Sequence, residues 1–261
     1  MKFKFVIVGK DGKFEMSDDQ LKGICPEDAS DDIKKSCECV ANNLEFVKYS
    51  DNKEPLAVIY NRELKNERSD RKHDFVVFLH ADVKFDIPFF MSRCESCAEK
   101  YDVMGLCGAE KINTNTSPLN WFSGSMYAPM GRWGCVTHGE NGNQLAFFSE
   151  DRKEITDHAV AAIDGLCIVF GKKALESEML FDEQFTFNQY DTDISFQTLI
   201  TYGLRLGVVV EPHLQHYSVG TSILSLEFLQ KEVDFRLKWK LNFPDNSNVK
   251  KLLEARNAKV S

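Results

Sequence analysis

Two residues that could bind a cation directly follow an apolar segment of the chain. His80 and Asp82 come after the continuous apolar run Phe75–Leu79, which is typical of a buried central strand. If the strand continues, their side chains point to the same side. A carboxylate at a strand end can bind Mg²⁺ or Mn²⁺, with substrate phosphates in the remaining coordination positions. In the alternative interpretation, Asp82 caps a turn and His80 is a hydrogen-bonded core histidine.

A pair of aspartates, Asp191 and Asp193, ends the aromatic-rich segment that begins at Phe181. These residue types suit the start of a helix predicted over 192–202, with Asp191 as its N-cap and Asp193 in its first turn. A helix start does not explain the aromatic residues before it, which build a rigid wall in front of the helix. Because a helix N-terminus favours the ionised form of a carboxylate, we expect Asp191 to be charged at neutral pH.

Histidines follow the last predicted strand, which covers 206–210. His213 and His216 lie directly after it. A histidine at a strand end could bind a metal or contact a phosphate, although a lone histidine is also compatible with a structural role. Ligands of open α/β sheets bind at the carboxyl ends of the strands, and we expect the three polar segments to meet there.

Strands and helices alternate along most of the chain. Apolar runs predict strands over 4–8, 44–49, 75–79, 103–107 and 206–210, and Pro55 and Pro88 each open a predicted helix. This alternation predicts a layered α/β fold with right-handed crossovers. Two more apolar runs flank Asp164 and Gly165, and with them the sheet is expected to be mixed.

The middle of the chain, 108–157, is different in character. It is rich in Asn, Gly, Ser and Trp and contains the turn Asn141-Gly142, which predicts a long loop and a hairpin. Long insertions of this kind in α/β enzymes usually shape a substrate site. The C-terminal segment 224–257 is predicted to be mostly helical.

Four motifs in this order resemble the family 2-like glycosyltransferases with the GT-A fold. They are FLHADV at 78–83, AAIDGLCIVF at 161–170, FDEQFTFNQYDTDIS at 181–195 and HYSVG at 216–220. The chain is most similar to the branch in which His-x-Asp-Val replaces the usual Asp-x-Asp. The similarity implies a GT-A domain over 1–221 and a C-terminal helical extension over 222–261 packed on it. The domain would contain a central mixed, mostly parallel sheet flanked by helices.

The resemblance assigns residues to a donor and metal site. Asp82 matches the metal-binding aspartate, His80 replaces the first acid of that motif, and His216 completes the metal or diphosphate site. Asp51 and Asn52 match residues that often meet the nucleotide base. Asn61 matches a helix position near the ribose or diphosphate, and Asp164 and Gly165 match a stretch that faces the donor and acceptor sugars.

The resemblance also assigns a base and an acceptor site. Asp191 matches the second residue of the family's Glu-Asp pair, which is the general base, and Tyr190 stands in place of the Glu. That substitution leaves Asp193 as the alternative base, with Asp164 the next candidate. Trp121, Trp133 and Tyr190 are the candidate acceptor-binding residues, because aromatic faces pack well on sugar rings.

The implied function is sugar transfer from a nucleotide-sugar donor, with a UDP-sugar favoured, to a hydroxyl of a glycan or other acceptor, as in polysaccharide biosynthesis. The reaction would depend on a divalent cation, Mn²⁺ or Mg²⁺, and would invert the anomeric carbon. One alternative is a sugar nucleotidyltransferase, although Gly9-Lys-Asp-Gly-Lys13 is a poor match to the loop of those enzymes. The other alternative is a non-catalytic carbohydrate- or partner-binding protein on the same scaffold.

Composition narrows the function classes further. A net charge of −8 disfavours a nonspecific nucleic-acid binder, which would usually be basic. No apolar segment approaches about 18 residues, and the N-terminal apolar run is too short for a signal peptide, which predicts a cytoplasmic protein without a membrane span. The 8 cysteines are therefore expected to be reduced thiols. The alternative, a zinc site at Cys94-x-x-Cys97, lacks a partner pair with suitable spacing.

Overall fold

The computed structural model describes residues 1–9, 14, 41–119, 131–139, 144–147, 157–211, 213–217, 225–245 and 247–258. The strands are β1 (Phe3–Val8), β2 (Leu44–Tyr49), β3 (Phe75–His80), β4 (Val83–Lys84), β5 (Val103–Gly105), β6 (Cys107–Ala109), β7 (Arg132–His138), β8 (Gln144–Phe147), β9 (His158–Ala159), β10 (Ala162–Ile163), β11 (Cys167–Phe170), β12 (Leu206–Val208) and β13 (Gln215–His216). The helices are α3 (Leu56–Asp70), α4 (Ile87–Cys97), α5 (Lys172–Glu176), α6 (Tyr190–Phe196), α7 (Leu226–Lys238) and α8 (Asn248–Ala258), and a π-helical turn (Gln197–Thr201) follows α6.

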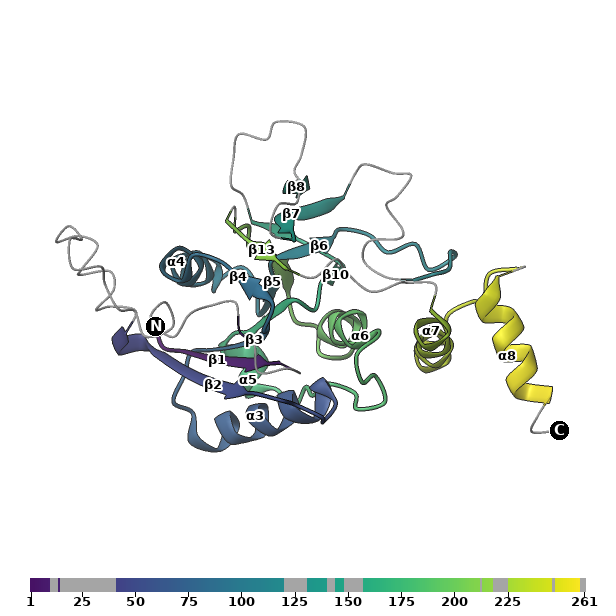
Figure 1. Cartoon of the computed structure of the whole chain (residues 1–261), viewed down its shortest axis with the longest axis horizontal. Coiled ribbons are helices and arrows are strands. Elements are labelled where there is room, and N and C mark those ends of the chain that lie inside the picture. The colour runs from purple at the N-terminus through teal and green to yellow at the C-terminus, as the bar shows by residue number, and fades with distance from the viewer. Residues whose placement is uncertain are drawn as a thin grey trace.

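The larger sheet has 7 strands in the order β2-β1-β3-β11-β5-β12-β9. β1 pairs in parallel with both β2 and β3, and β12 pairs in parallel with β5. β11 lies antiparallel between β3 and β5, and β9 is antiparallel to β12. Strands β2, β1, β3, β5 and β12 therefore run in one direction. The predicted α/β architecture, with a central mixed, mostly parallel sheet flanked by helices, is confirmed (Figure 1).

The sheet is covered on both faces, which explains its continuous apolar strands. Along β1, Phe5 and Ile7 belong to the core cluster that contains the inner side chains of α4. The alternate residues Val6 and Val8 belong to the cluster that contains α3, α5 and α6. Figure 1 shows α3 and α4 on opposite sides of the sheet. A strand buried on both faces gains from apolar residues at every position, which is the pattern seen in the sequence.

A second sheet of 6 strands contains the order β10-β6-β7-β13-β4, with β8 paired to β7. The antiparallel pairing of β7 with β8 confirms the predicted hairpin, although its turn residues, 141–143, lie outside the described residues. The chain passes directly from β3 to β4, from β5 to β6, from β9 to β10 and from β10 to β11, and each of these steps crosses from one sheet to the other. These crossings position the candidate site.

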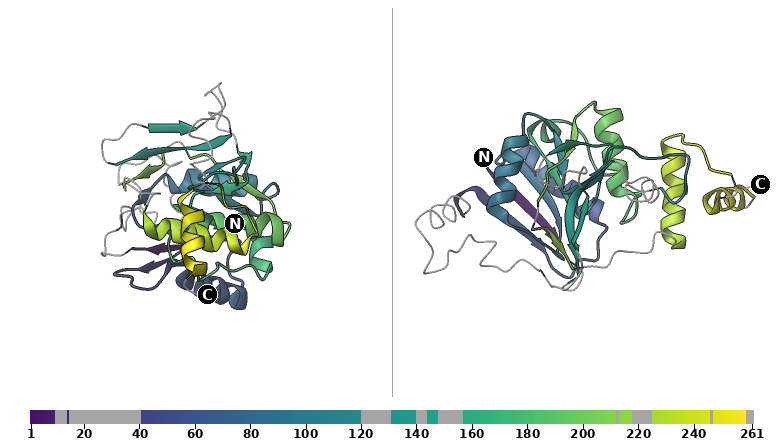
Figure 2. Two further views of the ribbon diagram at one scale, coloured as in Figure 1. Left: turned by 90° about the vertical axis from the view of Figure 1, so that its right-hand side faces the viewer. Right: turned by 90° about the horizontal axis from the view of Figure 1, so that it is seen from above.

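The C-terminal helices α7 and α8 lie to one side of the α/β body (Figure 2). Ser225 caps α7 by accepting a hydrogen bond from the Phe228 amide, and α7 and α8 share a small apolar cluster. The buried Arg236 on α7 pairs with Glu232 and donates to backbone carbonyls of the 114–116 loop. The proposed domain boundary, 221/222, lies outside the described residues and stays a prediction.

The described cysteines are buried and form no disulfide bond; they are Cys94, Cys97, Cys107, Cys135 and Cys167. Cys25, Cys37 and Cys39 lie outside the described residues.

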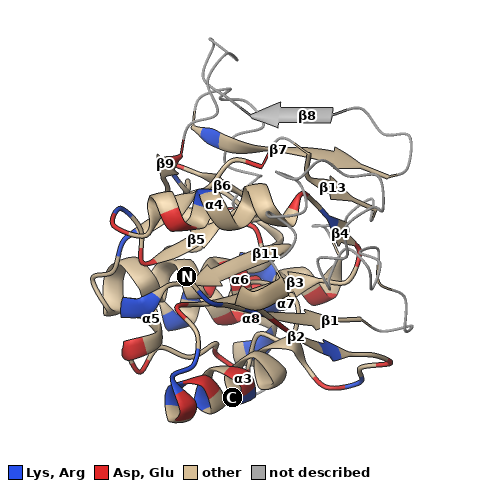
Figure 3. Cartoon of the chain, turned by 90° about the vertical axis from the view of Figure 1, so that its left-hand side faces the viewer, with Lys and Arg blue, Asp and Glu red and all other residues tan. Residues whose placement is uncertain are grey.

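Basic and acidic residues alternate along the outer helix α3 (Figure 3). None of the described helices combines the length and hydrophobicity that a bilayer crossing requires.

Candidate metal centre and its surroundings

The first crossing between the sheets places His80 and Asp82. His80 is the last residue of β3 in the larger sheet, and β4 of the second sheet begins at Val83. The His80 amide donates to the carbonyl of Leu166, 3.0 Å away, so the end of β3 remains paired with the chain that enters β11. His80 and Asp82 therefore lie at the carboxyl end of a central strand, as predicted.

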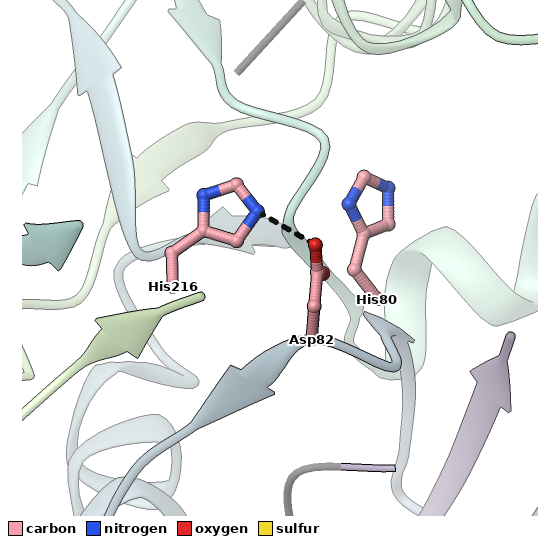
Figure 4. A group of neighbouring side chains, drawn as sticks. All are labelled: His80, Asp82 and His216. Atoms are coloured by element: carbon pink, nitrogen blue, oxygen red, sulfur yellow. Dashed lines mark ion pairs between the residues drawn. The ribbon is translucent and has the colours of Figure 1, made fainter. Parts of the chain in front are cut away.

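Strand pairing brings His216 to the same place. β13 is antiparallel to β4, with His216 opposite Val83, and the Tyr217 amide donates to the Asp82 carbonyl at 2.9 Å. Ligand atoms of His80, Asp82 and His216 all lie within 4.8 Å of one another. Figure 4 shows the three side chains converging. Among the described residues this is the one group of three metal-ligating side chains.

The pKa values of Asp82 and His216 depend on each other. His216 Nε2 lies 3.4 Å from Asp82 Oδ2. Burial alone would raise the pKa of Asp82, but the hydrogen bond and charge of His216 and the charge of His80 leave it below its usual value. Burial would lower the pKa of His216, but the charge and hydrogen bond of Asp82 raise it overall. Asp82 and His216 therefore each stabilise the charged form of the other.

The donor set fits a divalent cation. It contains two imidazoles and one carboxylate, held close together by backbone pairing. Imidazole suits transition metals, whereas Mg²⁺ prefers a shell made of oxygen ligands. Of the two predicted ions, the residues therefore fit Mn²⁺ better than Mg²⁺. The structure adds His80 to the two ligands that were predicted.

Asp164, Gly165 and Asp191 lie beside this group. Gly165 belongs to the crossing from β10 to β11, and its amide donates to Asp191 Oδ2 at 3.2 Å. The Leu166 amide donates to Asp164 Oδ1 at 2.8 Å. The crossing thus holds two carboxylates near the end of β3, which the sequence predicted only as separate motifs.

The protonation of Asp191 differs from the expectation. Helix α6 begins at Tyr190 and not at residue 192, so Gln189 is the N-cap and Asp191 lies inside the first turn. Burial, and then the negative charge of Asp164, raise the pKa of Asp191 to about 7, although the amides of Thr192 and Gly165 oppose the shift. The expectation of a fully charged carboxylate is therefore wrong, and Asp191 titrates near neutral pH.

Asp193 does not face the metal ligands. Its side chain is 1% exposed and accepts hydrogen bonds from Lys238 Nζ, Trp239 Nε1 and Gln197 Nε2, each at 2.8 Å. Burial raises its pKa, although these partners oppose the shift. Both carboxylate oxygens are engaged in attaching the α7 region to α6. The structure therefore gives Asp193 a structural role and does not support its assignment as a base.

Asn61 is also occupied by structural contacts. Its side chain is 3% exposed and exchanges hydrogen bonds with the backbone of Phe181, donating to the carbonyl at 2.9 Å and accepting from the amide at 2.8 Å. It also donates to Glu183. The predicted contact of Asn61 with a ribose or diphosphate is not supported, because its polar atoms hold the segment that leads to α6.

Asp51 and Asn52 form a turn at the end of β2, as predicted from the sequence. The Asn52 amide donates to the carbonyl of Gly9, the residue after β1, at 2.9 Å. The Asn52 side chain bonds with the backbone of Glu54. The turn therefore lies at the carboxyl ends of β1 and β2, and its contact with a nucleotide base stays a prediction.

The described aromatic candidates for acceptor binding are engaged in contacts within the protein. Tyr190 is 4% exposed, and its hydroxyl lies 2.8 Å from both His80 Nε2 and the Gly165 carbonyl oxygen. Trp133 lies at the start of β7, stacked on His158 at 3.8 Å between ring centroids, and it donates to Glu110. Neither contact pattern supports acceptor binding, and Trp121 lies outside the described residues.

Two residues near the centre were missed. His138 ends β7 opposite His216, with 5.4 Å between their ring centroids, and Phe187 stacks on His80 at 6.1 Å. Phe187 belongs to the aromatic segment before Asp191, and the sequence singled out that segment as a whole without assigning a role to Phe187. The position of His138 follows from the pairing of β7 with β13, a long-range contact that no local sequence pattern reveals.

Comparisons with known proteins give distant similarities. No family model and no curated protein matches the chain. Similar solved structures include A197 from STIV, 17% identical over 85% of this chain and 97% of that one, with a TM-score of 0.42. TarS 1–349 from S. aureus, solved with UDP, is 12% identical over 94% of this chain and 68% of that one, with a TM-score of 0.47. GalNAc-T7, solved with UDP, GalNAc and Mn²⁺, is 9% identical over 90% of this chain and 47% of that one, with a TM-score of 0.44. None of these TM-scores reaches 0.5, so the site residues and the sequence motifs carry the functional proposal.

Proposed function

We propose that this chain is a metal-dependent glycosyltransferase that moves a sugar from a nucleotide-sugar donor, a UDP-sugar in the first instance, to a hydroxyl group of a glycan. The observation that carries the proposal is the convergence of His80, Asp82 and His216 within 4.8 Å at the carboxyl end of the sheet. The GT-A assignment rests on the motifs that supply these residues and on the mixed sheet that positions them.

The group would hold the diphosphate end of the donor. A divalent cation bound there supplies positive charge that neutralises the leaving diphosphate. His80 and His216 would act as neutral ligands, so binding of the cation would compete with protonation of His216. Asp82 stays ionised because its pKa lies below the usual value.

Asp191 would accept the proton of the attacking hydroxyl. A sugar hydroxyl is a weak acid, so a carboxylate must take its proton as the new bond forms. A base with a pKa of about 7 is well matched to this task, because it is available at neutral pH and still binds a proton strongly. One base on the face opposite the diphosphate would give single displacement with inversion.

The test is incubation of the protein with a panel of nucleotide sugars, with and without Mn²⁺, followed by separate detection of nucleoside diphosphate and pyrophosphate. We expect Mn²⁺-dependent release of nucleoside diphosphate, and a decrease of roughly 10²–10⁴-fold in Asp191→Asn. Release of pyrophosphate would instead indicate a nucleotidyltransferase. Donor binding without turnover in any acceptor mixture would indicate a non-catalytic binding protein.

A further inference from the structure

The buried hydroxyl of Tyr190 connects the proposed metal ligand His80 to the backbone of Gly165. The oxygen lies 2.8 Å from His80 Nε2 and 2.8 Å from the Gly165 carbonyl oxygen. The phenol has one proton, and a carbonyl oxygen can only accept a hydrogen bond. Both contacts are satisfied in one arrangement, in which Tyr190 donates to Gly165 and accepts from a protonated Nε2 of His80.

This arrangement defines the protonation of the neutral imidazole. When Nε2 carries the proton, Nδ1 carries the lone pair. Figure 4 shows one ring nitrogen of His80 directed toward Asp82 and the other directed away from it. The nitrogen bonded to Tyr190 is Nε2, which leaves Nδ1 as the ligand atom of His80. Metal-binding histidines usually donate their other ring N–H to an acceptor that fixes this state.

The packing around Tyr190 leaves the hydroxyl little freedom to move. A Cβ atom on Gly165 would lie 2.1 Å from the Tyr190 oxygen, so the hydroxyl occupies the space that a side chain at 165 would fill. The Tyr190 ring packs against Tyr60, Phe181 and Phe187. The glycine and the aromatic segment therefore fix the hydroxyl at one place relative to His80.

His80 and Tyr190, which contact each other, are also the two residues that depart from the family pattern. His80 stands in place of the first acid of the usual Asp-x-Asp, and Tyr190 stands in place of the Glu before the base. A carboxylate ligand needs no choice of protonated nitrogen, whereas an imidazole ligand does. The other histidine shows the contrast, because His216 Nδ1 is buried without a hydrogen-bond partner among the described residues.

We propose that Tyr190 is a positioning residue that fixes the proton of His80 on Nε2 and thereby presents Nδ1 to the cation, an inference that rests on the proposed metal-dependent function. It replaces the acceptor-binding role predicted for Tyr190 from the sequence. The hydroxyl acts through His80 and does not contact the substrate.

The chain offers a matched control. Tyr60 is a second fully buried tyrosine, its ring centroid is 6.3 Å from that of Tyr190, and its hydroxyl has no partner among the described residues. Tyr190→Phe and Tyr60→Phe each remove one buried hydroxyl from the same aromatic cluster. Of these two hydroxyls, only that of Tyr190 contacts His80 Nε2.

The experiment combines ¹⁵N NMR of the histidine rings in the metal-free protein, at a pH where they are neutral, with calorimetric titration of Mn²⁺. We expect the wild-type spectrum to show His80 protonated on Nε2. Tyr190→Phe should show a mixture of the two protonated forms and a Mn²⁺ affinity weakened roughly 10–100-fold. Tyr60→Phe should match wild type in both measurements. Protonation on Nδ1 in wild type, or equal Mn²⁺ affinity in Tyr190→Phe, would overturn the inference.

The outcomes separate this inference from the proposed function. If wild type binds no Mn²⁺, the metal-dependent function fails, and the NMR spectrum of the metal-free wild type still decides where the proton of His80 lies. If Tyr190→Phe does not fold, the same wild-type spectrum gives the decision. If the spectrum agrees but no sugar is transferred, the inference stands as a property of the metal ligand and the transferase function is wrong.

Discussion

At the scale of single residues, the environment of Asp191 determines its chemistry more than its place in the sequence does. Its position near a helix start predicted an ionised carboxylate. The fold places Asp164 nearby and limits access to water, and together these raise the pKa to about 7. Because both causes come from distant parts of the chain, they cannot be read from the residues around Asp191.

The raised pKa predicts a pH-dependent stability for the metal-free protein. The folded state keeps the proton of Asp191 up to about pH 7, whereas the unfolded chain loses it near its ordinary value of 3.8. Between these values the folded state binds more protons, so stability falls as pH rises through this window. Asp191→Asn removes this dependence. Urea denaturation at about pH 5 and about pH 8 should therefore show wild type losing stability relative to Asp191→Asn.

The absolute stability of the variant is not the readout, because an asparagine cannot accept from both backbone amides that Asp191 contacts. The readout is the difference between the unfolding free energies of wild type and Asp191→Asn as a function of pH. A difference that stays constant, or that grows in favour of wild type at high pH, would show that Asp191 is ionised as an ordinary aspartate.

At the scale of elements, α6 connects the candidate site to the C-terminal helices. Its first turn carries Tyr190 and Asp191 toward the metal ligands, while Asp193 points to Lys238 and Trp239 at the end of α7. By sequence, Asp191 is the expected base and Asp193 is the alternative, and the helix directs the two side chains to different places. This separation gives them different predicted phenotypes.

Asp193→Ala should destabilise the protein without affecting metal-dependent nucleotide binding. The change leaves the Trp239 N–H without its acceptor and removes one of the two acidic partners of Lys238, the other being Asp182. We expect a loss of about 1–3 kcal/mol in the free energy of unfolding, measured by urea denaturation. Asp245→Ala, which removes an exposed ion pair with Lys250, is the control and should destabilise the protein much less, because solvent screens an exposed pair. Loss of Mn²⁺-dependent UDP binding in a folded Asp193→Ala would place Asp193 in the site instead.

Strands β1, β2, β3 and β12 and the helices that begin near Pro55 and Pro88 were predictable because their apolar patterns are local. The predicted strand 103–107 is instead divided between β5 in the larger sheet and β6 in the second sheet. The helix start at Tyr190 was not predictable, since Gln189 adopts a left-handed backbone conformation (φ 69°) that sequence does not signal for glutamine. The candidate ligands Asp82 and His216 were predicted from motifs, and the structure brings them together with His80. The hydrogen bonds of Asn61 and Asp193 depend on tertiary contacts, which no local sequence pattern reveals.

At the scale of the whole molecule, the candidate site forms where the chain crosses between the two sheets. The chain leaves the larger sheet at His80 and enters the second sheet at Val83, and β13 returns His216 beside this crossing. The crossing from β10 to β11, at Asp164 and Gly165, brings the carboxylates of Asp164 and Asp191 to the same edge of the larger sheet. The site is therefore a property of the junction between the sheets.

The central claim is that this junction binds a divalent cation that in turn holds a nucleoside diphosphate. The most direct measurement is a calorimetric titration of UDP with and without Mn²⁺, in wild type and in Asp82→Ala. The Asp82 side chain is 40% exposed, so the variant should fold, which circular dichroism checks. We predict that Mn²⁺ tightens UDP binding by at least about tenfold, or roughly 1.4 kcal/mol, in wild type and has no effect in Asp82→Ala. Equal UDP affinity with and without Mn²⁺ in wild type, or an undiminished Mn²⁺ effect in folded Asp82→Ala, would contradict the account.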